Sequence, residues 1–425
     1  MDLSLPVAEG PLRGAVAVPG DKSLAHRAAL FAALAEGDSE FRNYPDSGVT
    51  RAMRGALDAL GVPSILEDGV LRLSGNGFRS FPNYGATAYC GNSATTIRLL
   101  AGALVGTGSD ATLDGSAGLR RRPMDRIADP LRLLGADIAT ADGRAPLHVR
   151  PGRLAHVDYA LPVASAQVLS CLQLAALGGD GESRFTVPGP VRDHTVRMLR
   201  SMGAPIRQEP DGTTFVAPLS APLRPLCASL PGDISSAAFL FAAAAIVPGS
   251  RITVKGLGVN PTRTGMLDVL SAMGAHVTMS DEREEMGEPI ADVTLEADGL
   301  CGVEICDGLV VRAIDEFPAI AAVAAFAAGE TVVRDATELR YKESDRIAAI
   351  VAQLRALGAD AAELPDGFTV RGGTLIGGTA HANGDHRLAM SMALCGLRAP
   401  VTVAGAEILD ESFPAFASTL RSLMV

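Results

Sequence analysis

Basic side chains recur where apolar helices are expected to begin. Lys22 and Arg27 open one apolar stretch, Arg98 lies early in a second, and Arg387 opens a later one. A cation in the first turn of a helix opposes the helix macrodipole, so each placement is unfavourable for a helix on its own. A bound anion reverses this argument, because free backbone N–H groups and basic side chains then converge on it. At any single position, the basic residue could instead be a solvated surface charge. The recurrence of basic residues at several expected helix starts favours anion-binding sites.

Further basic residues lie in two loops. Lys342 and Arg346 are four residues apart, so on a helix they would share a face and repel each other unless an anion lay nearby. Residues 120–122 are three successive arginines after a glycine-rich turn, for which a solvated loop is an equally good interpretation. The segments GNSATT (91–96) and SAQ (165–167) offer small side chains at expected helix starts, where backbone N–H groups are accessible to phosphate.

Candidate acids and bases lie beside these cations. Asp315 begins an expected apolar helix, where a helix cap is the alternative interpretation. Glu343 stands next to Lys342 and could serve only as an ion-pair partner. Asp233 and His386 are further candidates. No two histidines have the spacing of metal ligands, so the sequence does not indicate a metal site.

Composition limits the classes of function. The chain has 425 residues, enough for more than one hydrophobic core. Its 37 Lys and Arg against 48 Asp and Glu give a net charge of −11, which argues against a general nucleic-acid or membrane surface. The longest apolar runs, 237–248 and 317–328, are too short to span a bilayer and predict buried helices. No export signal is recognisable, so we expect a cytoplasmic protein.

One pattern repeats six times along the chain. Each copy has a polar or small start, an apolar helix, a short β-rich run, and an amphipathic helix that ends in Gly. The copies begin near residues 21, 91, 165, 233, 315 and 384. The terminal glycines should adopt the left-handed conformation that ends a helix; they are Gly61, Gly135, Gly203, Gly274 and Gly358.

The repeat predicts a mixed α/β fold with two domains. Pro-Gly-Asp occurs at 19–21 and again at 231–233, and three copies follow each occurrence. We therefore expect one domain over residues 21–230 and a second over residues 231–425, which residues 1–20 join. The apolar helices have almost no polar face, so neighbouring copies must cover them on all sides.

The ordered motifs resemble those of the 5-enolpyruvylshikimate-3-phosphate (EPSP) synthase family over nearly the whole chain. PGDKSLAHR is similar to its N-terminal signature, GNSATTIRLL to its phosphoenolpyruvate (PEP) loop, and RRRPMDR to its arginine loop. SAQ, RDHT, NPTRTG, DEFP, LRYKESDR and GDHRLAM are similar to further family blocks in the same order. NPTRTG, SAQ and Ala94 together look most like the class II, bacterial form.

This resemblance implies a fold and a reaction. The fold is a two-domain, inside-out α/β barrel, in which each domain has three βαβαββ repeats around a pseudo-threefold axis and the active site lies in the interdomain cleft. The first domain would mainly bind shikimate 3-phosphate; the second would contribute to the PEP site and supply acid and base residues. The reaction transfers the enolpyruvyl group of PEP to the 5-hydroxyl of shikimate 3-phosphate and releases phosphate. We expect a monomer with no metal, organic cofactor, nucleic acid or membrane partner.

The resemblance also implies the residues of the site. The catalytic residues would be Asp315 as base, with Glu343 and Lys22 as acids. The PEP ligands would be Lys22, Asn92, Ala94, Arg122, Gln167, Arg346 and Arg387. The shikimate 3-phosphate ligands would be Lys22, Ser23, Arg27, Ser165, Ala166, Gln167, Arg192, Asp315 and Lys342.

Three departures from the family pattern matter. Ala94 stands where many members have Gly, and its methyl group should narrow the phosphate end of the PEP pocket, which implies tolerance to the longer inhibitor glyphosate. Glu411 lies where one branch has a PEP-facing Lys, so we leave it out of the site. Leu24-Ala25 and Leu169 replace more usual polar residues without removing an assigned ligand.

Two other functions remain open from the sequence. One is the sibling enzyme that transfers enolpyruvate to UDP-N-acetylglucosamine, which has Lys-Asn where this chain has Lys22-Ser23 and a reactive Cys in a loop that here, at 114–122, has none. The other is an inert anion-binding paralogue that keeps the scaffold. Against it, Lys22, Asp315 and Glu343 are all present.

Overall fold

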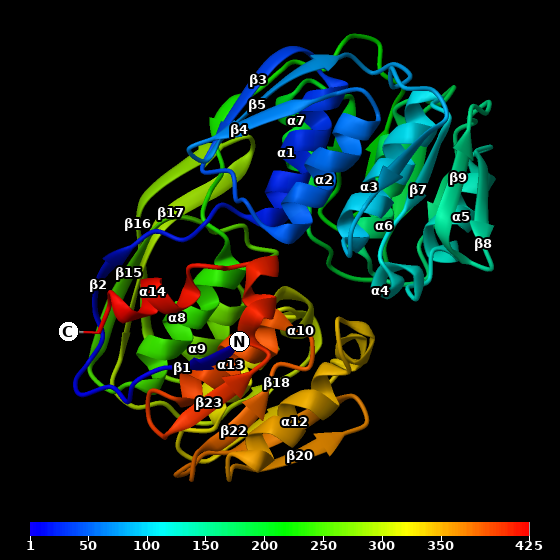
Figure 1. The fold of residues 1–425 in the computed structure, drawn as a ribbon. Helices are drawn as coiled ribbons and strands as arrows, with labels where there is room; N and C mark the ends of the chain where they lie inside the picture. The colour runs from blue at the N-terminus through cyan, green and yellow to red at the C-terminus, as the bar shows by residue number, and fades with distance from the viewer. Residues whose placement is uncertain (425) are drawn as a thin grey trace. The chain divides into compact units, whose positions relative to one another are not determined.

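The computed structural model describes residues 1–424 and divides into two compact units (Figure 1). The central unit comprises Gly20–Leu230 with Glu284–Glu288. The terminal unit comprises Met1–Pro19, Pro231–Arg283 and the residues from Pro289 onward. The chain passes from one unit to the other at 19/20 and at 230/231. The sequence analysis placed the domain boundaries at 20/21 and 230/231. The sequence did not predict that the segment 284–288 packs with the central unit.

The central unit contains three sheets with the same strand order, in which each first strand is parallel to the second and the last two strands are antiparallel. The first repeat contains α1 (Lys22–Leu34), β3 (Glu36–Arg42), α2 (Gly48–Ala59), β4 (Ser64–Glu67), β5 (Val70–Asn76) and, from far along the chain, β14 (Cys227–Ser229). The second contains β6 (Ala86–Tyr89), α3 (Ala94–Thr107), β7 (Ala111–Asp114), α4 (Ala117–Arg120), α5 (Asp125–Leu133), β8 (Asp137–Ala141) and β9 (Arg144–Arg150). The third contains β10 (Asp158–Ala160), α6 (Ala166–Ala176), β11 (Ser183–Thr186), α7 (His194–Ser201), β12 (Ile206–Gln208) and β13 (Thr214–Val216).

The terminal unit repeats this plan, and its last sheet has three strands. The fourth repeat contains β2 (Arg13–Val16), α8 (Ile234–Ile246), β15 (Ser250–Gly258), α9 (Gly265–Ala272), β16 (His276–Glu285) and β17 (Glu288–Ala297). The fifth contains β18 (Glu304–Ile305), α10 (Asp307–Arg312), α11 (Phe317–Ala324), β19 (Glu330–Val333), the 3-10 helix η1 (Thr337–Tyr341), α12 (Arg346–Ala356), β20 (Asp360–Leu364) and β21 (Gly367–Arg371). The sixth contains β22 (Gly378–His381), α13 (His386–Cys395), β23 (Val401–Ala404), η2 (Ala406–Glu411), α14 (Phe416–Arg421) and, from the start of the chain, β1 (Asp2–Ser4).

These sheets confirm the mixed α/β repeat. In the described residues there are six small mixed sheets, consistent with repeated βαβαββ units. The five glycines predicted to end helices all have positive φ, from 91° at Gly61 and Gly203 to 109° at Gly274. A side chain there would be strained, whereas Gly adopts this conformation at little cost.

Apolar helices form the core of each unit, as the sequence predicted. Every residue of α8 is buried, as is every residue of α11. In the central unit α3 packs closely on α6, because a Cβ at Gly102 would lie only 2.1 Å from the carbonyl oxygen of Cys171. Small residues therefore let the helix backbones approach each other. Among the described residues, no helix combines the length and apolarity that crossing a membrane requires.

Candidate functional site

Hydroxyl and carboxylate side chains cap the inner helices of the central unit. Asp21 accepts a hydrogen bond from the backbone N–H of Leu24 at 2.9 Å at the start of α1. Ser93 accepts one from Thr96 at 3.1 Å at the start of α3, and Ser165 caps α6 in the same way. The segments GNSATT and SAQ therefore begin helices, as predicted. The capping also explains why small polar residues occupy these positions without any ligand.

Side-chain contacts join these three helix starts. Gln167 on α6 donates from Nε2 to Oγ1 of Thr95 on α3 at 2.9 Å, and Arg98 donates to its Oε1. His26 on α1 lies 3.2 Å from Oγ of Ser93, measured from Nε2. Side-chain contacts therefore join the starts of α1, α3 and α6, and one of the residues in these contacts is the predicted ligand Gln167. Arg98, which the sequence singled out only as a misplaced cation, orients the predicted ligand Gln167.

Neutral groups hold the buried guanidinium of Arg27. Its Nε donates to Oγ1 of Thr195 at 2.8 Å, and one terminal nitrogen donates to Oγ of Ser170 at 3.0 Å. The other donates to the carbonyl oxygen of Ser23 at 3.0 Å. These partners fix the orientation of the guanidinium. The sequence missed Thr195 and Ser170, although Thr195 lies within the RDHT motif.

Burial and nearby cations keep His26 neutral. Burial lowers the pKa of its imidazole to about 4, and the charges of Lys22 and Arg27 act in the same direction. A hydrogen bond between Nδ1 and the Lys22 carbonyl oxygen, at 2.5 Å, opposes the shift. At neutral pH, His26 therefore adds no charge to the helix starts.

Other predicted residues of the central unit lie in loops around these helices. Asn92 accepts a hydrogen bond from Ser116 at 2.9 Å, which links the predicted PEP loop to the start of α4. Arg122 follows α4 and is partly buried. Arg120 instead pairs with Asp114 and lowers the pKa of that carboxyl group, so the basic run contains a structural ion pair. Arg192 precedes α7 and is also partly buried.

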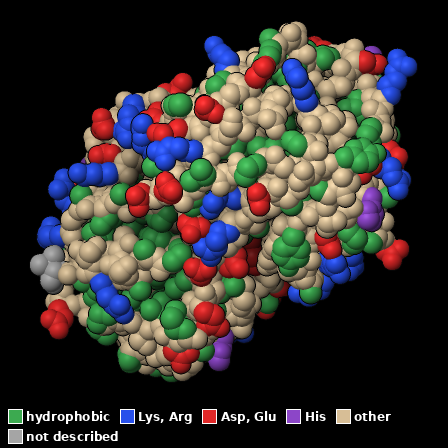
Figure 2. Space-filling view, turned by 45° about the horizontal axis from the view of Figure 1, so that its top comes forward, with side chains coloured by type: hydrophobic (Ala, Val, Ile, Leu, Met, Phe, Trp, Pro, Cys, Tyr) green, Lys and Arg blue, Asp and Glu red, His purple; other side chains and the backbone are tan. Residues whose placement is uncertain are grey.

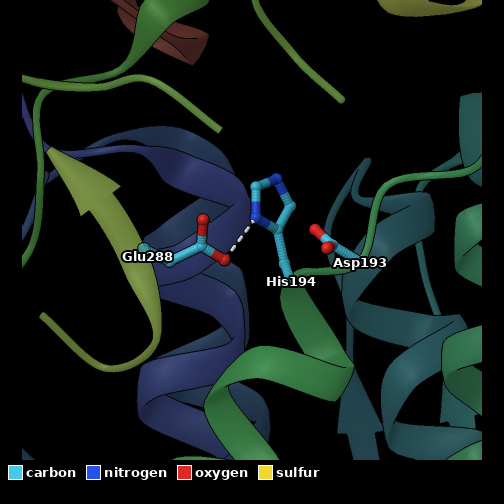
Figure 3. A group of neighbouring side chains, drawn as sticks. All are labelled: Asp193, His194 and Glu288. Carbon is cyan, nitrogen blue, oxygen red and sulfur yellow. Dashed lines mark hydrogen bonds and ion pairs between the residues drawn. The ribbon is translucent and has the colours of Figure 1, made fainter. Parts of the chain in front are cut away.

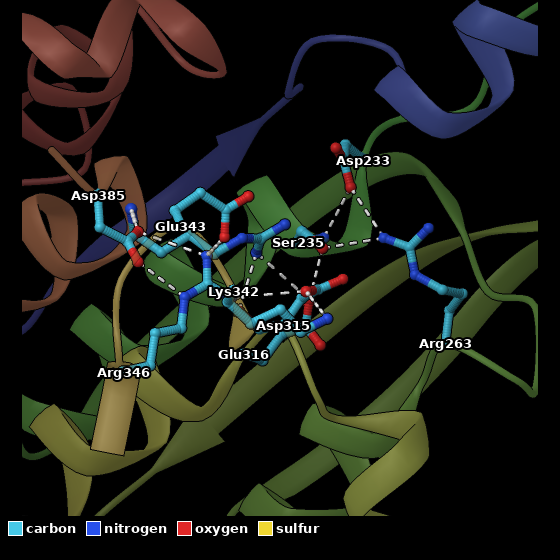
Figure 4. A network of polar contacts seen from close by, with 10 residues as sticks. Asp233, Ser235, Arg263, Asp315, Glu316, Lys342, Glu343, Arg346 and Asp385 are labelled. Carbon is cyan, nitrogen blue, oxygen red and sulfur yellow. Dashed lines mark hydrogen bonds and ion pairs between the residues drawn. The ribbon is translucent and has the colours of Figure 1, made fainter. Parts of the chain in front are cut away.

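In the terminal unit, carboxylates surround Arg346 (Figure 4). Its side chain is 1% exposed, and Nε donates to Asp385 at 2.8 Å. One terminal nitrogen donates to Glu343 at 2.6 Å, and the other lies 3.6 Å from Oδ1 of Asp315. Burial alone would lower the pKa of Arg346, but the charges of Glu343, Asp385 and Asp315 raise it above its usual value. In return, Arg346 overcomes the effect of burial on Asp385 and lowers the pKa of that carboxyl group.

Lys342 and Arg346 do not share a helix face, so that expectation was wrong. Lys342 follows η1 in an extended backbone conformation, and α12 begins only at Arg346. Both cations instead approach Asp315, whose Oδ1 lies 3.4 Å from Nζ of Lys342. The sequence analysis required a negative charge near Lys342 and Arg346. The carboxylate of Asp315, which belongs to the protein itself, supplies such a charge.

Asp315 is not the cap residue of α11, because Glu316 occupies the N-cap position. The backbone carbonyl oxygen of Asp315 accepts a hydrogen bond from Arg387 at 3.0 Å. The start of α13, which carries Arg387, is capped by Asp385 through the backbone N–H of Arg387 at 2.9 Å. Asp385 thus caps a helix and binds Arg346. The sequence missed it, although the motif GDHR places an acid directly before two basic residues.

The remaining acidic candidate, Asp233, has a structural role. Asp233 caps α8 through the backbone N–H of Ser235 at 2.8 Å and pairs with Arg263 at 3.3 Å. Glu411 lines a hollow together with Asn383 and Gly384, residues of the loop that leads into α13.

Among the described residues, Asp193, His194 and Glu288 form a group with ligand atoms within 4.8 Å of one another (Figure 3). Nδ1 of His194 lies 2.8 Å from Oε1 of Glu288, and Arg197 donates to Asp193 at 2.7 Å. Arg197 also donates to the carbonyl oxygen of Gly287 at 2.9 Å. Both carboxylates thus have protein partners. These contacts connect α7 to the segment that ends at Glu288, and they account for the grouping of the three side chains without a metal.

Comparisons with known proteins agree over almost the whole chain. The family model described as EPSP synthase (3-phosphoshikimate 1-carboxyvinyltransferase) matches residues 7–420. The 3-phosphoshikimate 1-carboxyvinyltransferase of Acidithiobacillus ferrooxidans is 46% identical over 411 residues, covering 95% of this chain and 94% of that protein. The Methylococcus capsulatus enzyme of the same name is 44% identical, covering 97% and 95%. A solved structure of EPSP synthase from Acinetobacter baumannii superposes with a TM-score of 0.91 at 37% identity, covering 100% of this chain and 98% of that one.

Proposed function

The chain belongs to the EPSP synthase family, and we propose on this basis how its residues carry out the family's reaction. It is a transferase with 3-phosphoshikimate 1-carboxyvinyltransferase activity. The enolpyruvyl group of PEP moves to the 5-hydroxyl of shikimate 3-phosphate, and phosphate leaves. Both substrates are anions, which accounts for the basic residues at the helix starts.

The observation that carries the residue assignment is the contact of Asp315 with two cations. Asp315 lies between Lys342 and Arg346, and Arg346 also binds Glu343. Basic groups and two carboxylates therefore lie together, and one carboxylate is more exposed than the other: the side chain of Glu343 is 32% exposed and that of Asp315 is 16% exposed. Such a cluster can bind an anion and transfer protons.

Each of the two steps of the reaction needs one protonation and one deprotonation. In the addition step, the methylene carbon of PEP gains a proton and the 5-hydroxyl loses one as its oxygen bonds to the adjacent carbon. In the elimination step, the tetrahedral intermediate loses a methyl proton, and the departing phosphate takes up the proton that the hydroxyl had released. We assign Asp315 as the base towards the hydroxyl and Glu343 and Lys22 as the acids. The positive charges would stabilise the intermediate.

Substrate binding is assigned to both units. We propose that Arg346 and Arg387 of the terminal unit bind PEP together with central-unit residues, which are Lys22, Asn92, Ala94, Arg122 and Gln167. Shikimate 3-phosphate would bind mainly in the central unit, through Lys22, Ser23, Arg27, Ser165, Ala166, Gln167 and Arg192, with Lys342 and Asp315 contributing from the terminal unit. Support comes from the shared cluster at the starts of α1, α3 and α6 and from the orientation of Arg27.

A coupled assay tests the reaction. The protein is incubated with PEP and either shikimate 3-phosphate or UDP-N-acetylglucosamine, and phosphate release is measured. Release only with shikimate 3-phosphate is expected. Release only with the sugar nucleotide, or with neither acceptor, would contradict the proposal.

The remaining sequence-based expectations stay predictions. They are glyphosate tolerance caused by Ala94, a monomeric state, a cytoplasmic location, the pseudo-threefold arrangement of the repeats, and the use of residues from both domains in one active site. Light scattering of the purified protein tests the monomeric state, and a dimer at micromolar concentration would contradict it.

A further inference from the structure

Glu316 is a fully buried carboxylate whose role is not helix capping. It follows Asp315 directly and occupies the N-cap position of α11, yet its side chain makes no capping hydrogen bond. Burying a carboxylate is costly unless charged or polar partners compensate for the lost water. The contacts of Glu316 therefore indicate what it does.

The first contact is with Arg387. The terminal nitrogen NH1 of Arg387 lies 3.6 Å from Oε1 of Glu316 and donates to the backbone carbonyl oxygen of Asp315 at 3.0 Å. Two successive residues thus hold one guanidinium, and the side chain of Arg387 is only 5% exposed. Any shift of Glu316 would move the proposed PEP ligand relative to the proposed base.

The second contact extends through Ser235. Ser235 donates from Oγ to Oε1 of Glu316 at 2.5 Å and accepts a hydrogen bond from Arg263 at 2.9 Å (Figure 4). A hydroxyl has one proton, and because Arg263 can only donate, that proton is directed to Glu316. Arg263 also pairs with Asp233 at 3.3 Å. A chain of alternating charges therefore runs from Asp233 to Arg387.

We propose that Glu316 is a positioning residue for the transferase reaction. Through Oε1 it fixes Arg387 against the backbone of Asp315, and Ser235 and Arg263 fix Glu316 in turn. The NPTRTG motif, which contains Arg263, thereby acts on the PEP ligand indirectly. The inference rests on the proposed role of Arg387 in PEP binding and extends it to residues without substrate contact.

Two substitutions at Glu316 separate positioning from stability. Glu316→Ala removes Oε1, so the KM for PEP should rise about 10-fold while the KM for shikimate 3-phosphate changes less than about twofold. Glu316→Gln retains a carbonyl oxygen in the place of Oε1, so it should stay within about threefold of the wild-type KM for PEP. Should Glu316→Ala fail to fold, Ser235→Ala keeps the carboxylate but removes its donor, and should raise the KM for PEP about threefold.

Glu288→Ala is the matched control, since Glu288 is another buried glutamate and its side chain contacts His194. It should lower stability without a selective change in the KM for PEP. Unchanged KM for PEP in Glu316→Ala, an equal rise for both substrates, or the same selective rise in the control would overturn the proposal. Wild-type turnover with PEP and shikimate 3-phosphate, measured alongside, tests the proposed function separately.

Discussion

Two buried basic groups near the starts of helices respond oppositely to their surroundings. In the central unit, burial and the charges of Lys22 and Arg27 lower the pKa of His26 to about 4. In the terminal unit, Arg346 is equally buried, but carboxylates raise its pKa despite burial. The difference lies in the charged groups beside each residue, because burial acts against the charged form in both.

The same contrast extends to the other cations. Arg27 and Arg98 donate to hydroxyl, amide and carbonyl groups, whereas Arg346, Arg387 and Arg263 each approach at least one carboxylate. Hydrogen bonds to uncharged groups orient a cation for contact with a substrate. Carboxylates offset the charge of the cation but supply groups that can move protons. We therefore expect substitutions in the central unit to affect substrate binding and those around Asp315 to affect turnover.

The largest effect is expected for Asp315→Asn. An amide keeps the size of the side chain but cannot accept a proton as a base, so kcat should fall about 10³-fold, within the usual range for such groups. Steady-state kinetics should show KM values within a few-fold of wild type. Asp360→Asn, at an exposed position of strand β20, is the control and should retain full turnover. A variant at 315 with near-normal kcat would remove Asp315 as the base.

The next effect concerns pH and His26. Because the native pKa, about 4, lies below the value of about 6.5 in the unfolded chain, the unfolded state binds more protons between these values. The contribution of neutral His26 is complete above pH 6.5, and roughly 3 kcal/mol is lost as the pH falls to 4.

Chemical denaturation of wild type and His26→Gln at pH 7 and 4.5 measures this loss. The variant should lose less stability on acidification than wild type, whereas His276→Gln, at an exposed position, should follow wild type. Identical pH dependence of wild type and His26→Gln would show that His26 does not titrate in this way.

A smaller effect is expected for Arg27→Lys. Lysine cannot form the fork of hydrogen bonds to Thr195 and Ser170, so the KM for shikimate 3-phosphate should rise about 10- to 30-fold with a small change in kcat. Arg184→Lys, on the exposed part of β11, serves as the control. If kcat falls and the KM is unchanged, the proposed division between binding and turnover is wrong.

The smallest effect is expected for Ala94→Gly. Ala94 is buried at the first position of α3, where removal of its methyl group should enlarge the pocket and make glyphosate inhibit at about 10-fold lower concentration. Ala117→Gly, also directly after a serine N-cap, controls for helix destabilisation. Equal glyphosate sensitivity of wild type and Ala94→Gly would reject the tolerance hypothesis.

Local patterns in the sequence determined the repeat, the mixed α/β fold and the buried helices. Helix-ending glycines, apolar runs and capping residues depend on neighbours within one or two turns, so Gly61 and Gly274 could be predicted without tertiary information. The motifs likewise identified the family. They also identified which basic and acidic residues to examine, including Arg27, Asp315 and Glu343.

Only the tertiary structure decided which of these residues are partners. Lys342 and Arg346 meet at Asp315 rather than on a helix face, Asp385 binds Arg346 from 39 positions away, and Glu316 binds Ser235 from 81 positions away. The strands β2 and β14 complete sheets of repeats that lie far away in the sequence. Such contacts depend on how the helices and strands pack, because the neighbours of a residue in the sequence do not determine which distant residue it contacts.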